Sequence, residues 1–332
     1  MLTRETRTRE TAGNATYEPV GSDTHDENRN DRRGTETCSK RRPRRDQVSP
    51  FEGTGVPRPL MLVYTAEMLR IPAIIASTAC ALGLLCPALA AAAAQDVSAL
   101  DALVRAYPDH LVPTERPNTV LWKDGTEMVF DDGVPKTGFE DLLNRASLKD
   151  QMAMRYPRSW PSAAPLVNAD PGRVRNDAFF RKMYGSSADA VRGNLVPVEW
   201  LGGTSVPFTK VNGAAEALCR VREELKTLPA DVQQYVAQPV GTFAWRPIAG
   251  TTRLSMHSFG AAIDFQLPRA LHRYWKWDTR PPNDAPVYPV SILQDGRLRQ
   301  VVEVFERHGF IWGGKWFHYD TMHFEYRPEL PG

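Results

Sequence analysis

The amino-acid sequence predicts an α+β fold for residues 195–330. Two segments in this range have the apolar spacing of amphipathic helices. Short apolar stretches with the length of β-strands lie between these segments and after them. Helices and short strands in one stretch of chain together predict a compact α+β unit.

The first helix is expected between Asn212, a residue type that favours helix N-termini, and Pro229, which cannot continue a helix. Its apolar positions recur at helical spacing, at Leu218, Val221, Leu225 and Leu228. The second helix is expected over residues 298–308, with Gly309 as its stop. Strands are expected over residues 241–245, 261–266 and 322–326.

Residues 95–194 have a mixed character. Residues 120–130 predict two short strands around an Asp124-Gly125 turn, and residues 139–154 have a helical pattern. The following segment is broken into loops by Pro157, Pro161, Pro165 and Pro171. We interpret residues 95–194 as an N-terminal elaboration packed on the domain of residues 195–330.

The first 94 residues contain a polar leader and an export signal. Residues 1–67 lack any helical or strand period and have the composition of a disordered segment. Residues 68–94 have a short basic start, an apolar centre and an alanine-rich end, which is the pattern of a signal peptide. A start at Met68 explains the leader as an over-extended translation, and an unusually long signal region is the alternative. We expect a secreted or periplasmic protein that begins near Gln95 and has no stable membrane span.

Charge and cysteine content argue against nucleic-acid binding and against a metal site built from thiolates. The chain has 41 Lys+Arg and 39 Asp+Glu, and residues 61–332 hold 29 of each. A neutral body argues against nucleic-acid binding, which needs a basic face to neutralise phosphates. The 4 cysteines include no CxxC pair, so a metal ion would be held by histidines and carboxylates.

Two histidines and two aspartates in the C-terminal part have a spacing suited to a metal site. His257 precedes Asp264, and Asp320 precedes His323. Two imidazoles and one carboxylate suffice to hold a catalytic zinc ion and leave its fourth position open to water. A second carboxylate must then lie beside that water as a base. On spacing alone, a hydrogen-bonded His–Asp pair is the alternative interpretation.

The pattern Ser-x-His-x-x-Gly-x-Ala-x-Asp, followed by Asp-x-x-His, is complete at Ser255, His257, Gly260, Ala262, Asp264, Asp320 and His323. It resembles the zinc D-alanyl-D-alanine carboxypeptidase family, which includes D,D-dipeptidases and phage L-alanyl-D-glutamate endolysins. Residues 245–247 and 309–314 are also similar to the endolysin-like branch. The resemblance covers about residues 195–329. It implies a hedgehog/DD-peptidase-like fold, in which helices flank a small antiparallel sheet.

The resemblance also implies the roles of the site residues. His257, Asp264 and His323 would bind one Zn²⁺ ion, and Asp320 would be the general base. Many members have Glu at the position of Asp320, so the Asp places this chain nearer the endolysin-like branch. Arg246 falls where the family has an arginine that contacts substrate, and its guanidinium suits a carboxylate or a developing oxyanion. A surface arginine paired with a nearby acid is the alternative for Arg246.

Four further residues are candidates for substrate binding or for support of the ligands, namely Ser255, Arg253, His318 and Glu325. Ser255 is expected to orient the loop of the first histidine ligand by a hydrogen bond. Arg253 is a weaker candidate for the same work as the substrate-contacting arginine. Glu325 would accept a hydrogen bond from the second histidine ligand, with which it shares a strand face. His318 would bind substrate or have a structural role.

These inferences predict a monomeric zinc metallopeptidase that acts on the stem peptides of peptidoglycan. A D-alanyl-D-alanine carboxypeptidase activity is the first expectation. An endopeptidase that cuts between L-Ala and the D-acidic residue is the second. A zinc-stabilised cell-wall-binding module without catalysis is the alternative from another class, and it would be expected to have lost Asp320 or a ligand.

Overall fold

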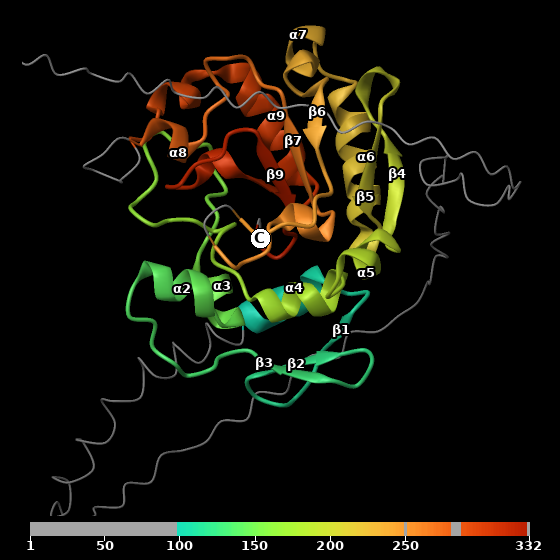
Figure 1. Ribbon diagram of the computed structural model, residues 1–332, viewed down its shortest axis with the longest axis vertical. Helices are drawn as coiled ribbons and strands as arrows, with labels where there is room; N and C mark the ends of the chain where they lie inside the picture. The colour runs from blue at the N-terminus through green and yellow to red at the C-terminus, as the bar shows by residue number, and fades with distance from the viewer. Residues whose placement is uncertain (1–97, 249–250, 280–286, 331–332) are drawn as a thin grey trace, which may run out of the picture. The chain divides into compact units, whose positions relative to one another are not determined.

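The structure is a computed structural model that describes residues 98–248, 251–279 and 287–330 (Figure 1). The polar leader and signal peptide predicted for residues 1–94 lie outside the described residues. The fold is α+β, as predicted, with short antiparallel sheets and helices around them. None of the described helices has both the length and the apolar character needed to cross a membrane.

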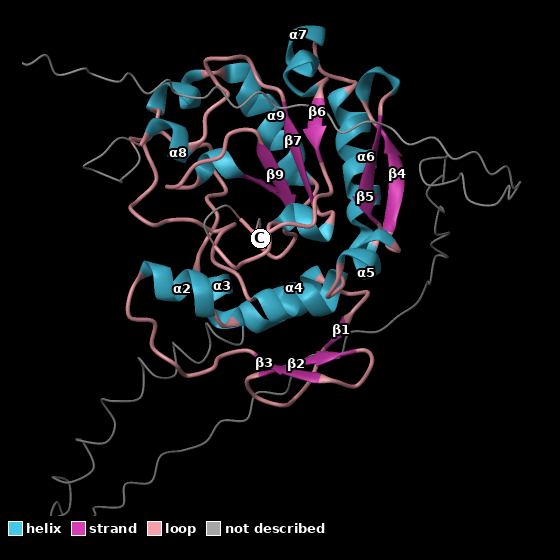
Figure 2. Ribbon diagram, viewed as in Figure 1, coloured by secondary structure: helices cyan, strands magenta, loops and turns pink. Residues whose placement is uncertain are grey.

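A four-stranded antiparallel sheet forms the centre of the C-terminal part (Figure 2). Its strands are β6 (Pro239–Gly241), β7 (Ala262–Phe265), β8 (Phe310–Trp312) and β9 (His323–Tyr326), in the order β6-β7-β9-β8. The predicted strands at 261–266 and 322–326 are therefore confirmed. Residues 310–312, for which no strand was expected, form the edge strand β8.

Two amphipathic helices cover this sheet. They are α6 (Ala214–Leu225) and α9 (Gly296–Arg307), which confirm both predicted helices within a few residues. Their apolar sides are buried in one core with residues of the central strands. Phe305 of α9 stacks on Phe324 of β9 with ring centroids 4.2 Å apart, so the packing of α9 holds the strand that carries His323.

Two sequence-based boundaries were wrong. Asn212 is not the N-cap of α6, because it has a left-handed backbone and its side chain donates to the Ala106 carbonyl. The N-cap position is taken by Gly213. Of the strand expected at 241–245, only Gly241 belongs to β6, which pairs with β7 over residues 239–241 with a register irregularity after Pro239. Residues after 241 instead form a loop that lies beside the candidate site.

A two-stranded antiparallel sheet lies beside α6. It is formed by β4 (Leu195–Glu199) and β5 (Ser205–Thr209). The short helix α7 (Ala230–Gln233) precedes β6, and α8 (Trp275–Asp278) follows β7. Between α8 and β8, the 3-10 helix η5 (Val290–Gln294) leads into α9.

The N-terminal segment has its own small sheet and helices. Strands β1 (Leu111–Val112), β2 (Thr119–Trp122) and β3 (Glu127–Val129) are antiparallel, and the predicted Asp-Gly turn joins β2 to β3. The helical pattern of residues 139–154 forms two helices, α2 (Phe139–Arg145) and α3 (Leu148–Ala153). Helices α4 (Asp177–Tyr184) and α5 (Ala188–Arg192) follow.

The N-terminal segment and the C-terminal part share a hydrophobic core. Phe179 and Phe180 of α4 are fully buried in one cluster with Met256, Phe259 and Ala261. The last three residues belong to the turn that precedes β7. Packing of α4 therefore supports the turn on which the first histidine of the candidate site lies.

Asp295 is expected to stabilise α9 as its N-cap. Its carboxylate accepts hydrogen bonds from the backbone N–H groups of Arg297 and Leu298, at 3.0 and 2.8 Å. Asp295→Ala leaves these groups without a partner and should lower the free energy of unfolding by about 1 kcal/mol in urea titrations. Asp295→Asn keeps the acceptor and is the control. Equal loss in both variants would contradict the capping role.

Candidate active site

The central sheet brings Asp264 and His323 together. Asp264 of β7 and His323 of β9 are direct register partners in adjacent antiparallel strands. Side chains at such paired positions lie on the same face of the sheet, with Cβ atoms about 4.5–5.5 Å apart. In agreement, His323 Nδ1 lies 2.9 Å from Asp264 Oδ1. Strand pairing thus explains how residues far apart in sequence meet.

A tight turn adds His257 to this pair. His257 lies in the 3-10 helix η4 (Met256–Phe259), where the Ser255 hydroxyl accepts a hydrogen bond from the His257 backbone N–H at 3.3 Å. The turn ends at Gly260, whose φ of 62° is left-handed. A Cβ atom at Gly260 would also collide with the Leu195 side chain. Glycine at this position therefore lets the chain reverse into β7.

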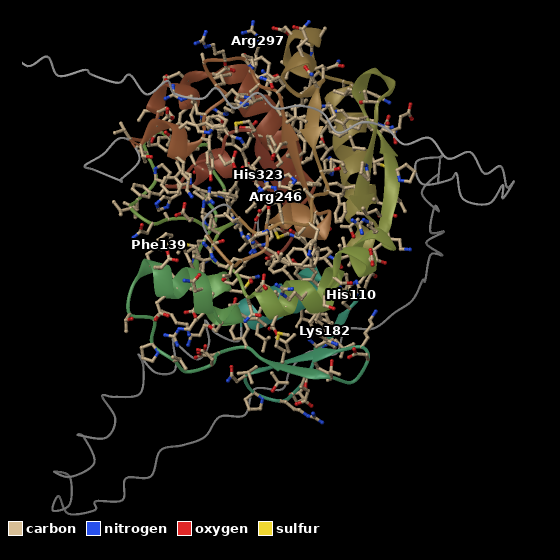
Figure 3. The ribbon with its side chains drawn as sticks, in the orientation of Figure 1. His110, Phe139, Lys182, Arg246, Arg297 and His323 are labelled. Carbon is tan, nitrogen blue, oxygen red and sulfur yellow. The ribbon has the colours of Figure 1, made fainter. Side chains whose placement is uncertain are left out.

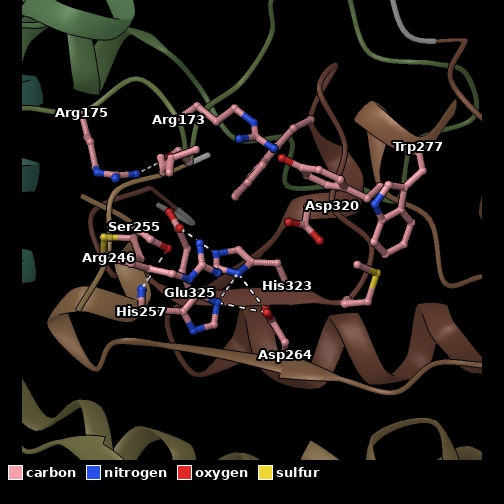
Figure 4. Close-up of a pocket in the computed structure, with 16 residues that line it drawn as sticks. Arg173, Arg175, Arg246, Ser255, His257, Asp264, Trp277, Asp320, His323 and Glu325 are labelled. Atoms are coloured by element: carbon pink, nitrogen blue, oxygen red, sulfur yellow. Dashed lines mark hydrogen bonds and ion pairs between the residues drawn. The ribbon is translucent and has the colours of Figure 1, made fainter. Parts of the chain in front are cut away.

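Each histidine has its outer ring nitrogen in contact with an acceptor, and Figure 4 labels His257, His323 and Glu325. His257 Nδ1 lies 2.8 Å from the Thr242 carbonyl oxygen, and His323 Nε2 lies 3.0 Å from Glu325 Oε2. An outer N–H that donates to these oxygens leaves the inner nitrogen of each neutral ring as a bare acceptor. The inner atoms, His257 Nε2 and His323 Nδ1, face each other at 3.2 Å.

The Asp264 carboxylate completes a set of three acceptors without hydrogens between them. Its Oδ2 lies 3.1 Å from His257 Nε2. Such a set is stabilised only by a positive charge at its centre, either a proton on one ring or a cation. The same set fits a metal ion, because tetrahedral zinc with bonds of about 2.0–2.1 Å places its ligand atoms about 3.3 Å apart. The three residues are the cluster among the described residues whose ligand atoms could share one ion.

The pKa values of His323 and Asp264 also indicate that a positive charge stabilises the cluster. Burial would lower the pKa of His323, but hydrogen bonds to the Asp264 and Glu325 carboxylates raise it to about 10. Burial opposes ionisation of Asp264 too, yet the two histidines hold the pKa of its carboxyl well below the usual range. Without a metal ion, a proton on His323 is therefore the favoured source of the charge.

Asp320 lies beside this cluster. Its backbone carbonyl accepts a hydrogen bond from the His323 N–H at 3.2 Å, and its side chain lines the same cavity (Figure 4). Burial raises the pKa of its carboxyl, and Oδ1 is buried without a hydrogen-bond partner in the described part of the chain. A Cβ atom at Gly313 would collide with the Asp320 backbone, so glycine there permits this placement.

The cluster opens into a cavity of about 280 Å³. Three arginines line it, namely Arg173, Arg175 and Arg246. Arg246 is exposed, whereas Arg175 is buried and donates to the Gly172 and Leu254 carbonyl oxygens. Trp277 also lines the cavity and is 62% exposed, so an aromatic ring stands at its opening. A buried ligand set beside an arginine-rich opening is suited to an anionic or carbonyl-containing ligand.

The segment that contains the candidate site was compared with known protein families. Residues 249–326, which contain the three clustered side chains and Asp320, match a family described as D-alanyl-D-alanine carboxypeptidase. Residues 249–326 are therefore similar to this peptidase family, which supports the resemblance seen in the sequence motif. Members of the D-alanyl-D-alanine carboxypeptidase family are in general zinc-dependent peptidases. Neither a curated protein nor a solved structure was found to match the chain.

The predicted site residues line two different cavities. Arg246, Ser255 and Glu325 line the cavity of the histidine cluster, and Glu325 contacts His323 as described above. Arg253 and His318 instead line a neighbouring cavity (Figure 3 labels Phe139 in its wall). The His318 ring is held by a 2.5 Å contact between its Nδ1 and Asp170 Oδ2, and it does not line the cavity of the histidine cluster.

Sequence reasoning missed the contribution of the N-terminal segment. Arg173 and Arg175 lie before α4, outside the residues that match the family. Arg173 donates from Nε and NH2 to the His318 carbonyl at 3.0 and 2.8 Å, and it stacks over the Trp316 ring. The Pro171-Gly172 turn followed by two closely spaced arginines was the available signal. Nothing in that local pattern indicates which surface the arginines contact.

A chain of buried charged groups continues from His323 into the core. Glu325 Oε1 accepts from Arg327 NH1 at 3.0 Å, and Arg327 Nε donates to Glu329 Oε1 at 2.6 Å. All three side chains are at least 96% buried. Glu329 also accepts hydrogen bonds from Tyr107 and from Gln151 of the N-terminal segment, at 2.7 and 3.0 Å. This network fixes the Glu325 carboxylate that orients His323 and ties it to both parts of the chain.

Arg327→Met tests this network. The substitution leaves two buried carboxylates without their cation and should lower the free energy of unfolding by about 3–5 kcal/mol in urea titrations. Arg299→Met is the matched control, since the Arg299 side chain is 53% exposed in its pair with Glu303. The control should change stability by less than about 1 kcal/mol. Equal stability of the two variants would show that the buried charges do not support the site.

Proposed function

We propose that the protein is an exported zinc metallopeptidase that hydrolyses amide bonds in the stem peptides of peptidoglycan. The observation that carries the proposal is the convergence of His257, Asp264 and His323 in a cavity that Asp320 also lines. The match of residues 249–326 to the D-alanyl-D-alanine carboxypeptidase family supports the substrate class. Export rests on the signal peptide predicted for residues 68–94, outside the described residues.

The proposed mechanism assigns a role to each group of the cavity. A zinc ion held by His257 Nε2, His323 Nδ1 and Asp264 would supply hydroxide at neutral pH and polarise the substrate carbonyl. Asp320 accepts the proton of the attacking water and passes it to the leaving amine. Its Oδ1 has no partner among the described side chains, so this oxygen is available for that transfer. Thr242 and Glu325 keep both imidazoles in the tautomer that binds metal.

The arginines of the cavity support a substrate with a carboxylate. Arg246 is exposed at the cavity and is proposed to hold that carboxylate through its guanidinium fork. A carboxypeptidase needs such a group for the C-terminal end of its substrate. Release of the terminal D-alanine is therefore the first proposed activity. Cleavage between L-Ala and the D-acidic residue is the second, and it would use the same metal ligands and base.

The alternative of a non-catalytic cell-wall-binding module is less well supported. A module stabilised by zinc has no need for a second carboxylate beside the ion. Asp320 is nevertheless present in the cavity, and burial raises the pKa of its carboxyl. Retention of this group beside an open cavity favours catalysis.

Digestion of isolated muropeptides by the zinc-loaded protein tests the proposal. We expect mass spectrometry to show loss of the terminal alanine from pentapeptide stems. Asp320→Asn should slow the release about 10²–10⁴-fold, because the general base is lost. Zinc content is the control and should equal that of the unsubstituted protein. Intact muropeptides after digestion, or full activity of Asp320→Asn, would contradict the mechanism, and products cut after L-Ala would favour the endopeptidase.

A further inference from the structure

A second cavity of about 230 Å³ adjoins the cavity of the histidine cluster. The two cavities share Arg173, Ile248 and Tyr274 as wall residues. One side of the second cavity comes from α2 and the other from α8, which lie on the same side of the molecule in Figure 1. It is thus built jointly by the N-terminal segment and the peptidase-family domain. The shared wall residues place the second cavity next to the cavity of the histidine cluster.

The wall of the second cavity is a set of interlocked aromatic rings. Phe139 of α2 stacks on His318 with centroids 5.5 Å apart, and Trp275 of α8 meets the same ring edge-on at 4.6 Å. The contact between His318 Nδ1 and the fully buried Asp170 fixes the ring between them. These contacts form a preorganised apolar surface that suits the aliphatic part of a ligand.

Hydrogen-bond donors without partners line the same cavity. The Arg253 guanidinium makes one hydrogen bond to a described residue, from NH1 to the Arg173 carbonyl at 3.3 Å. Its Nε is buried and has no partner in the described ranges, and the same is true of Trp275 Nε1. A guanidinium has five N–H donors, and the Arg253 guanidinium uses one of them in a hydrogen bond to a described residue. Buried donors left unpaired are costly, which favours a ligand that supplies acceptors.

The charges that face the cavity have a positive excess. Arg173, Arg253 and Lys276 line it, and Glu140 is its one acidic lining residue among the described side chains. Glu140 is exposed and accepts a hydrogen bond from the Asn144 amide at 3.0 Å. Two further acids lie nearby: Asp177, which acts electrostatically on Arg253 and is paired with Arg181, and Asp170, which contacts His318. The cavity is therefore suited to an anion with a planar pair of acceptors, such as a carboxylate.

We propose that the second cavity binds a carboxylate-bearing residue of the same peptide whose amide bond lies in the metal cavity. The aromatic wall takes the aliphatic part of that residue, and Arg253 with Trp275 Nε1 takes its carboxylate. The inference rests on the proposed function, because it assumes a peptide substrate. It specifies the substrate further, as a peptide with a carboxylate upstream of the cleaved bond in addition to any at its end.

Two matched peptides test this inference. They are L-alanyl-γ-D-glutamyl-L-lysyl-D-alanyl-D-alanine and the same peptide with the α-carboxylate of its D-glutamyl residue amidated. Binding is measured by titration calorimetry with zinc-loaded protein that carries Asp320→Asn, so that hydrolysis is suppressed. We expect the carboxylate peptide to bind about tenfold more tightly than the amide, as for a charged hydrogen bond.

Substitution of Arg253 assigns the preference to this cavity. Arg253→Gln should bring the affinity ratio of the two peptides close to one, and Arg253→Lys should restore part of it. Arg299→Gln, an exposed change on α9, should keep the tenfold ratio. Thermal midpoints of the variants show whether each is folded.

Two results would overturn the inference. The first is equal binding of both peptides, or no binding of either, by the protein with an intact Arg253. The second is an unchanged preference in folded Arg253→Gln. Failure of the proposed function is distinguishable, because it would appear as absence of hydrolysis while the binding preference persists. Cleavage with equal binding would refute this inference alone.

Discussion

Three acceptor atoms that face one another without hydrogens between them constrain the whole candidate site. The register of β7 and β9 sets two of them opposite each other, and the turn ending at Gly260 supplies the third. Lone pairs at 2.9–3.2 Å repel unless a positive charge lies among them. The Thr242 carbonyl and the Glu325 carboxylate accept from the outer N–H of each imidazole, so the inner nitrogens carry lone pairs. The fold thereby builds an electrostatic requirement that a divalent cation meets.

The support for this arrangement comes from both parts of the chain. The buried sequence of charges from Glu325 to Glu329 connects the second histidine to Tyr107 and Gln151 of the N-terminal segment. Helix α4 packs under the turn of the first histidine. Gly172, Arg173 and Arg175 form part of the cavity wall. The N-terminal segment is therefore part of the candidate site rather than a separate attachment.

The sequence could predict those features that are encoded locally. The helices α6 and α9 and the strands β7 and β9 follow from apolar periodicity, and the ligand candidates follow from a motif with close internal spacing. Tertiary features escaped prediction. Asn212 was expected as an N-cap because of its residue type, but its amide satisfies the Ala106 carbonyl instead. Arg173 was not predicted as a site residue, because it lines the cavity only through the packing of distant loops. Arg253 was a sequence candidate, but the sequence could not predict that it lines a second cavity.

X-ray absorption spectroscopy of the zinc-loaded protein tests the central claim most directly. The proposed metal site predicts a zinc ion bound by two imidazole nitrogens and one carboxylate oxygen at about 2.0–2.2 Å, with one further light ligand from solvent. Outer-shell scattering from two imidazole rings should be present in the protein and reduced to one ring by His323→Ala. A spectrum with sulfur ligands or without imidazole scattering, or one that His323→Ala leaves unchanged, would contradict the account.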